Sequence, residues 1–446
     1  MESRSPVHEI VDALMAALRA LRVTAPTIDV ERWGFSIHAA LSAPGREYHN
    51  HDHVIEIAKA DDPLEVIAAL YHDAVYIQVD HGPPSAMRAE IEQALSLEGQ
   101  RWRVLPAAGA DPVTADVLAV FGYAPGDFVT PATGLNELAS ALVASIQLAR
   151  ALDREQRIAI AACIEQTIPF RADPVGDLRA RLAPLGLSGA TLEQTLVRAL
   201  RLGNRDVENF ADNDAARFLD NTWKLLPESN PALQLPTVYT VRDYRIALHK
   251  MEGFLAHLSA ERVFHAYADE PPASVHARRV ARATGNLDLA VRYLRAKLYS
   301  IALVEAIADV TGGDVPLDYF MGGMKHGDLG RGPKRIEQFL PHIGSVKHLD
   351  PALHRLLSEG RASESSFDTR PSPIGAFLMN AVGEGPMMAG FEQARKWWAG
   401  ASDAAQFIAS QPPRPLAAVA RAAAHIMQTR REALSQLVDR LEAAAS

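Results

Sequence analysis

The sequence has little of what would crosslink, secrete or anchor a chain. It holds one cysteine, Cys163, in 446 residues, so no disulfide can form within the chain. This cysteine usage fits a reducing compartment. The first residues lack the basic and then apolar pattern of a secretory signal, and no uncharged apolar run reaches the roughly 18 residues of a membrane span. We therefore expect a cytoplasmic protein without a membrane partner.

The sequence also lacks an excess of basic residues. It carries 45 Lys and Arg against 54 Asp and Glu, which gives a formal net charge of −9 at pH 7. A broad nucleic-acid surface needs a strong basic excess, so we expect no such surface. A small anionic substrate is still compatible with this charge, because a bound divalent cation can reverse the local field.

Most of the sequence has the pattern of helices. Hydrophobic residues make up 48% and charged residues 22%, which is ordinary for a globular protein with a sizeable core. Residues 64–76 place apolar side chains at three- and four-residue spacing, and Asp62 followed by Pro63 is typical of a helix start. The same spacing predicts helices over 135–151, 155–168 and 191–211. Only residues 101–105 indicate a strand, so the predicted fold class is all-α.

Two irregular stretches divide the sequence. Scattered Pro and Gly over residues 106–134 predict a looped insertion near 100–134, with one short helix, between two core helices. Residues 226–237 carry three prolines and predict a linker. We therefore expect a helical domain over 1–228 and a second helical domain over 239–446. The helices predicted in the second domain cover about 239–268, 285–311, 334–358 and 414–443.

Histidine and acidic residues concentrate in short segments of the first domain. His49 and His53 are four residues apart, so on one helix both rings would face the same side, one able to ligate a metal and the other beside it. His72 and Asp73 lie at the end of an apolar helix, where an ionised carboxylate is costly unless something compensates its charge. A divalent cation would do so. A mixed set of His and carboxylate suits Zn²⁺, Mn²⁺ or Fe²⁺, and Mg²⁺ mainly through the oxygens.

Three short segments follow one another in the first domain. They are Tyr48-His49-Asn50 with His53, then His72-Asp73-Ala74-Val75-Tyr76, then Asn136-Glu137-Leu138-Ala139-Ser140-Ala141. Their order resembles the HD superfamily of metal-dependent phosphohydrolases. The first segment is similar to the start of cyclic-nucleotide phosphodiesterase sites, and small bacterial HD proteins share all three segments. The resemblance covers roughly residues 40–225 and implies an HD-type helical bundle.

The resemblance implies a set of metal ligands. His53, His72 and Asp73 match the first three ligands, and Asp206 matches the fourth by its order along the chain. The surroundings of Asp206 depart from the usual Asp-x-Asp-Leu pattern, since they read Asn-Arg-Asp-Val. In addition, about 60 residues separate His-Asp from Asn-Glu here, whereas the small relatives keep these segments close.

The resemblance also implies catalytic roles. His49 matches the histidine that protonates the leaving oxygen, and Glu137 matches an acid near the metal-bound water, which it would orient or deprotonate. We assign Asn50 and Arg205 as candidate substrate-binding residues. The predicted activity is hydrolysis of a phosphate ester, of a nucleotide or a small phosphorylated metabolite, by water activated on Mn, Mg, Fe or Zn.

Several alternatives stay open at this point. The chain could be a metal-binding scaffold or regulatory module without turnover, or a di-iron oxygenase on the same fold, and a homo-oligomer is not excluded. His49 could be a core histidine bonded to a backbone carbonyl, and Glu137 or Asp206 could pair with an arginine. Asp80-His81 is a competing ligand pair. The basic loop over 325–335 could bind phosphate, although its sequence favours an ordinary surface loop.

Overall fold

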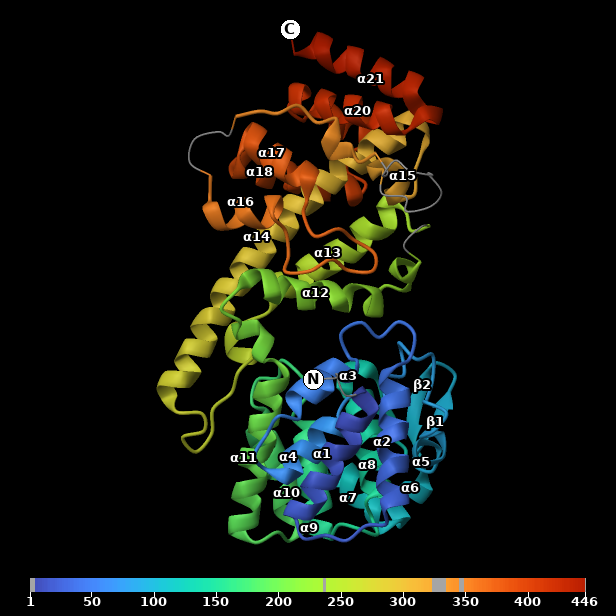
Figure 1. Cartoon of the computed structure of the whole chain (residues 1–446), viewed down its shortest axis with the longest axis vertical. Coiled ribbons are helices and arrows are strands. Elements are labelled where there is room, and N and C mark those ends of the chain that lie inside the picture. Colours follow the sequence, from blue (N-terminus) through green and yellow to red (C-terminus); the bar gives the residue numbers. More distant parts are fainter. Residues whose placement is uncertain (1–4, 236–237, 323–333, 345–348, 446) are drawn as a thin grey trace. The chain divides into compact units, whose positions relative to one another are not determined.

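The computed structural model describes residues 5–235, 238–322, 334–344 and 349–445, and most of them are helical (Figure 1). Within these ranges the strands are β1 (Leu95–Glu98), β2 (Arg101–Val104) and β3 (Phe128–Val129), which form one small antiparallel sheet in the order β1-β2-β3. The all-α prediction is confirmed, and β2 matches the predicted strand. None of the described helices has both the length and the apolar character that crossing a bilayer would require.

The chain forms two compact units. Unit 1 comprises Met1–Ala211 and Ser259–Thr284, and unit 2 comprises Asp212–Leu258 and Gly285–Ser446. The division therefore differs from the predicted one at 228–239. Of the prolines of the predicted linker, Pro227 is buried within helix α12 (Ala215–Ser229), and Pro231 begins a 3₁₀ turn, η4 (Pro231–Gln234), while residues 236–237 lie outside the described residues.

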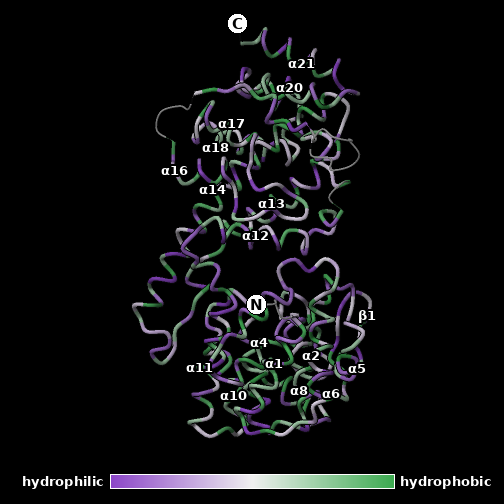
Figure 2. Tube along the Cα trace, viewed as in Figure 1, coloured by the Kyte–Doolittle hydropathy of each residue, from purple (hydrophilic) through white to green (hydrophobic). Residues whose placement is uncertain are grey.

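Unit 1 is a bundle of helices around α9, whose last eight residues are all buried. Helix α9 packs against α4, α7, α8 and α11, and α1 packs against α2 and α4. The hydropathy colouring follows this arrangement, with apolar stretches along the labelled helices of the bundle (Figure 2). The helices of unit 1 are α1 (Pro6–Ala20), α2 (Thr27–Leu41), α3 (His51–Ile57), α4 (Pro63–Tyr71), α5 (Arg88–Glu92), α6 (Pro106–Ala110), α7 (Pro112–Phe121), α8 (Leu135–Gln147), α9 (Arg154–Glu165), α10 (Pro174–Leu182) and α11 (Gly189–Asp206).

The stretch predicted as a looped insertion is mostly regular structure. It contains β2, α6, α7 and β3, and α7 packs against α8 and α9. Leu118 and Val120 of α7 are buried in the core. Asp111 caps α7, with its side chain accepting from the N–H of Thr114, and Gly122 ends the helix in a left-handed conformation. Several of the Pro and Gly residues thus mark helix ends, while Pro125 and Gly126 lie in the short turn between α7 and β3.

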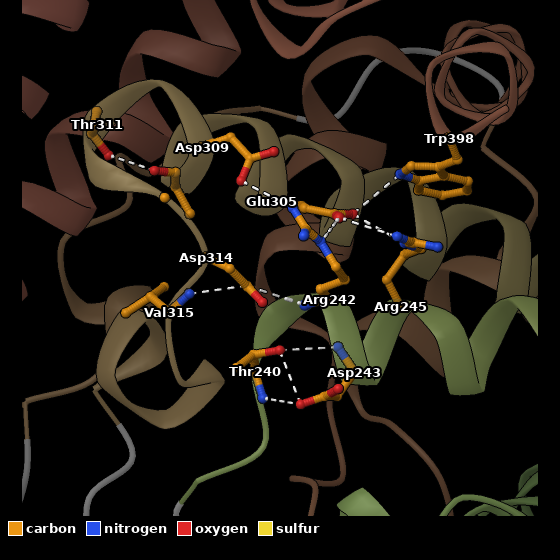
Figure 3. Close-up of polar contacts among 12 residues, drawn as sticks. Thr240, Arg242, Asp243, Arg245, Glu305, Asp309, Thr311, Asp314, Val315 and Trp398 are labelled. Atoms are coloured by element: carbon orange, nitrogen blue, oxygen red, sulfur yellow. Dashed lines mark hydrogen bonds and ion pairs between the residues drawn. The ribbon is translucent and has the colours of Figure 1, made fainter. Parts of the chain in front are cut away.

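Unit 2 is also helical. Helix α14 (Ala273–Gly312) begins in unit 1, and its part from Gly285 onward belongs to unit 2. Glu305 of this part is buried, and its carboxylate accepts hydrogen bonds from Arg242, Arg245 and the indole of Trp398 (Figure 3). These donors compensate the buried charge. The other helices of unit 2 are α12, α13 (Val241–His257), α15 (Leu317–Met321), α16 (Pro351–Ser358), α17 (Pro373–Val382), α18 (Glu384–Trp398), α19 (Ala404–Ala409), α20 (Pro413–Ile426) and α21 (Arg431–Ala444).

All four helices predicted in the second domain differ in extent from the observed ones. The prediction over 239–268 corresponds to the shorter α13, and the one over 285–311 lies within the longer α14. The other two are not single helices. Residues 334–358 do not form one helix: a 3₁₀ turn, η6 (Ile336–Gln338), precedes α16, and Asp350 caps α16 immediately before Pro351. The segment 414–443 is two helices, because the chain leaves helical geometry at Met427 between α20 and α21. A cap followed by proline starts a new helix in the first case.

Candidate metal centre

Three segments far apart in the sequence bring imidazole and carboxylate groups together in unit 1. His53 lies on α3, His72 directly follows α4, and Asp206 is the last residue of α11. Their ligating atoms all lie within 4.8 Å of one another. Nε2 of His53 is 3.1 Å from Oδ1 of Asp206, and Nε2 of His72 is 3.4 Å from the same oxygen. This group could hold a metal ion.

Asp73 adds a fourth donor at the same place. Its Oδ2 lies 2.9 Å from Nε2 of His72 and 3.4 Å from Nε2 of His53. The structure therefore brings together all four side chains predicted as ligands. The helix prediction around them was wrong in one respect, because α4 ends at Tyr71 and Asp73 lies in the turn that follows.

The tautomer of His72 is set by the backbone. Its Nδ1 lies 2.7 Å from the carbonyl oxygen of Ala69, and a carbonyl can only accept, so Nδ1 carries the proton. Nε2 then faces the carboxylates of Asp73 and Asp206. Both His72 Nε2 and Asp73 Oδ2 are buried atoms without a hydrogen-bond partner among the described residues. A neutral imidazole would point its lone pair at these anions, so a proton or a cation belongs between them.

The ionisation of the cluster follows from its mixed charges. Burial alone would lower the pKa of His72, but Asp73 and Asp206 outweigh burial and raise it well above the ordinary value. Burial alone would raise the pKa of both carboxyl groups, but the histidines lower it, to about 2 for Asp206. Both acids are therefore ionised at neutral pH, the state in which carboxylates bind metals.

His49 does not share a helix with His53 as predicted. Helix α3 begins at His51, because Asn50 is its cap and accepts from the N–H groups of Asp52 and His53. His49 therefore lies just before the helix. Its ring nevertheless stays near the cluster, with its centroid 6.0 Å from that of His53, and its charge helps to lower the pKa of Asp73.

The two residues predicted to bind substrate make structural contacts in the folded chain, and their role toward substrate stays a prediction. The side chain of Asn50 caps α3 through its oxygen and donates from Nδ2 to the carbonyl of Glu47. Nη2 of Arg205 donates to Oε2 of buried Glu65 at 2.6 Å, and Nη1 donates to the carbonyl of Ile57. Sequence adjacency to the ligands suggested substrate contacts, whereas these polar groups satisfy helix ends and a buried acid.

The Asn-Glu-x-x-Ser segment forms the start of α8, and it faces the turn that carries Asp73. Oδ1 of Asn136 accepts from the N–H of Ile77 at 3.1 Å, and Oγ of Ser140 accepts from the N–H of Val75 at 3.1 Å. Asn136 and Ser140 are four residues apart and share a helix face, and Glu137 is three residues before Ser140. Asn136 and Ser140 therefore hold the turn, and Glu137 is presented beside it.

Glu137 is the acid of the site whose pKa is raised. Its Oε2 is buried and has no hydrogen-bond partner among the described residues. Burial, together with the charges of Asp73 and Asp206, raises the pKa of Glu137 to about 7. Among the described residues no arginine donates to Oε2 of Glu137, so the alternative in which an arginine pairs with Glu137 is not seen at this oxygen. An acid with a pKa near neutral can both take and give a proton.

Other sequence alternatives are also resolved by the contacts. Arg201 and Arg205 do not neutralise Asp206, since they pair with Glu65 and Arg201 also pairs with Glu270. Asp80 is not free to act as a ligand with His81, because its carboxylate is bound by the guanidinium of a buried arginine. Residues 325–333 of the predicted basic loop lie outside the described residues.

That buried arginine is Arg46, which the sequence reasoning missed. Its Nε and Nη2 donate to the two oxygens of Asp80 at 2.9 and 2.6 Å. Its Nη1 donates to the carbonyls of Asp73 and His49 at 2.6 and 3.3 Å. Arg46 stands three residues before His49, but nothing in a single sequence marks an arginine as buried.

A separate cavity of about 270 Å³ lies within unit 2. Tyr239, Tyr244, Lys297 and Asp368 are among the residues that line it. None of the predicted site residues lines this cavity, and its lining holds no histidine. The convergent imidazoles and carboxylates, not the cavity, identify the candidate metal centre.

Comparison with models of known protein families gives no match for this sequence. Searches against curated proteins and against solved structures give no match either. The interpretation of the site therefore rests on its own residues and geometry.

Proposed function

We propose that the chain is a metal-dependent phosphohydrolase whose divalent ion is held by His53, His72, Asp73 and Asp206. One observation gives the strongest support for a bound metal ion. His72 has committed Nδ1 to the carbonyl of Ala69, and its Nε2 meets two ionised carboxylates within 3.4 Å. Ligating histidines usually donate their second ring N–H to a carbonyl or carboxylate, which fixes the tautomer as it is fixed here.

The donor set fits a divalent ion in charge and chemistry. Two carboxylates supply two negative charges, and two imidazoles supply neutral nitrogen donors. Such a set suits Mn²⁺, Fe²⁺ or Zn²⁺, while Mg²⁺ would rely on the two carboxylates. The single cysteine of the chain is compatible with a reducing, cytoplasmic setting.

The choice of phosphate esters is supported by the resemblance to HD phosphohydrolases. A bound divalent ion would lower the pKa of a coordinated water and polarise a phosphoryl oxygen. His49, whose ring lies near His53, would donate a proton to the leaving oxygen. Glu137, whose pKa is raised to about 7, would accept a proton from the attacking water. The substrate class is a nucleotide or a small phosphorylated metabolite.

Elemental analysis of the purified full-length chain tests the metal first. We expect about one equivalent of a divalent transition metal, and loss of that metal in His72→Ala. The second step is a panel of nucleotides and generic phosphomonoesters and diesters with added Mn²⁺ or Mg²⁺, with His49→Ala as the matched variant that keeps every ligand. Hydrolysis of a panel member that falls in His49→Ala supports the proposal.

The same experiment separates the two rival functions. Tight metal binding without turnover across the panel would favour a scaffold or regulatory module. Two irons per chain with oxygen uptake would favour a di-iron oxygenase. Purified protein that takes up no divalent metal would remove the basis of all three.

A further inference from the structure

The turn that carries Asp73 is held mainly by side chains. Helix α4 ends at Tyr71, so the backbone of residues 73–77 leaves the helical hydrogen-bond pattern. The carbonyl of Asp73 accepts from Arg46, and the N–H groups of Val75 and Ile77 donate to Ser140 and Asn136. Buried backbone groups need partners, and here side chains from distant segments supply them.

Arg46 joins this turn to the segment that precedes α3. The side chain of Arg46 is fully buried, and that of its partner Asp80 is 6% exposed. One nitrogen of the guanidinium, Nη1, reaches the carbonyls of both His49 and Asp73. The other two nitrogens are occupied by Asp80 in a two-point contact. Arg46 therefore fixes the spacing between a predicted ligand and the predicted general acid.

We propose that Arg46 is a positioning residue of the metal centre and that Asp80 orients it. This inference rests on the proposed function, because it takes Asp73 as a ligand and His49 as the acid beside it. The planar guanidinium presents donors in a rigid fork, so it can bind a carboxylate at two points and still serve carbonyls on its far edge. A lysine is a single point charge and cannot make both sets of contacts.

The chain offers a closely matched control in unit 1. Arg171 also binds a buried carboxylate, that of Glu165, with two nitrogens, and it donates to the carbonyls of Ile168 and Glu165. It contacts none of the predicted site residues through these bonds. Arg171→Lys removes the same kind of fork from the same unit, although Arg171 is 21% exposed and Glu165 keeps a second partner in Arg181. It therefore controls for the loss of an arginine–carboxylate fork away from the predicted site.

The experiment compares Arg46→Lys with Arg171→Lys in the full-length protein. Titration with Mn²⁺ should show roughly 10- to 100-fold weaker binding for Arg46→Lys, the range typical of partners that orient metal ligands, and near wild-type binding for Arg171→Lys. Hydrogen exchange of the metal-free proteins should be at least about tenfold faster over residues 73–77 in Arg46→Lys only, because that turn loses its anchor.

A second variant covers the case in which Arg46→Lys does not fold. Asp80→Asn keeps the shape of the partner and removes its charge, so it should bind Mn²⁺ more weakly than the wild-type protein and exchange faster over residues 73–77. The double variant should be no weaker in Mn²⁺ binding than Arg46→Lys alone, since both changes break one unit.

The outcomes separate this inference from the function on which it rests. Equal Mn²⁺ affinity and equal exchange in Arg46→Lys and Arg171→Lys overturn the positioning role while leaving the metal site in place. Wild-type affinity and exchange in Asp80→Asn overturn the role assigned to Asp80. If the wild-type chain binds no Mn²⁺, the proposed function fails, and the exchange comparison alone then decides whether Arg46 holds the turn.

Discussion

Nε2 of His72 lies 2.9 Å from Oδ2 of Asp73, although neighbouring residues on an α-helix point about 100° apart. The two side chains meet at the C-terminal end of α4, where the helix ends at Tyr71 and His72 keeps helical backbone angles. This helix end thus brings an adjacent His-Asp pair to the same place as His53 and Asp206.

Removing His72 should remove the metal. His72→Ala deletes the nitrogen donor whose orientation is fixed by the carbonyl of Ala69, and it leaves His53 as the one imidazole of the four predicted ligands. We expect metal content, measured by elemental analysis after dialysis, to fall to background. His51→Ala is the control, because His51 lies two residues from His53 but contacts exposed Asp52. Full metal content in His72→Ala would contradict the ligand assignment.

Removing His49 should spare the metal and slow turnover. His49 lies before α3, outside the four-donor group, so His49→Ala should keep wild-type metal content. Loss of a general acid typically costs roughly 10²- to 10⁴-fold in rate, and we expect kcat on a phosphate ester to fall in that range. Steady-state assays beside elemental analysis measure both. Metal lost together with activity would mean that His49 is itself a ligand.

Breaking the Arg205–Glu65 pair should destabilise unit 1 without acting on substrate. The carboxylate of Glu65 is 2% exposed, so Arg205→Gln would leave a buried acid with only a longer contact to Arg201. We expect a loss of about 3 kcal/mol in the free energy of unfolding, measured with urea. Because Arg205 has a structural role, KM should stay within about twofold of wild type at a temperature where the variant is folded. A raised KM with unchanged stability would restore Arg205 as a substrate contact.

The stability of unit 2 should depend on pH through Asp368. Its Oδ2 accepts from Trp223, Tyr244 and Lys297. Burial alone would raise the pKa of Asp368, but Lys297 and the other partners lower it. The folded-state pKa therefore lies below the unfolded value of about 3.9. The stabilisation is complete above that value, and it is lost as pH falls through the folded pKa.

Asp368→Asn provides the measurement for this pH dependence. The variant should lose about 3 kcal/mol at pH 7, because Lys297 is left buried without its counter-charge. The difference from wild type in urea unfolding should stay constant down to about pH 5 and shrink below about pH 4. Asp288→Asn is the control, since Asp288 is 70% exposed and its ion pair with Arg292 is long, at 3.7 Å. If the difference in free energy of unfolding between wild type and Asp368→Asn grew as the pH was lowered, the folded-state pKa of Asp368 would not lie below its unfolded value.

The sequence predicted best what depends on periodic apolar side chains. The helices around 135–151 and 155–168 exist as α8 and α9, because their apolar stripes face a common core. The four residues predicted as ligands from the resemblance also lie together. The helix predictions used local patterns whose physical cause lies within the segment itself, whereas the ligand prediction used the order of segments far apart in the chain.

The sequence failed where a side chain has two competing partners. Asn50 could bind substrate or cap a helix, and in the folded chain it caps α3, which places His49 outside that helix. Arg205 could bind phosphate or a buried acid, and in the folded chain it donates to Glu65. Arg46 gave no local signal at all, because its burial is created by segments that meet only on folding. Tertiary contacts decide such cases.

Unit 1 is discontinuous, and this constrains how its chemistry can be studied. The carbonyl and N–H of His265, in the returning stretch Ser259–Thr284, bond both ends of the Asn204 amide, two positions before Asp206. A protein shortened at residue 228 would lack these bonds, so the end of α11 would lose its brace. A low metal content in such a fragment would then look the same as the loss of a ligand by mutation. Only the uncut polypeptide can tell a missing ligand from a missing support.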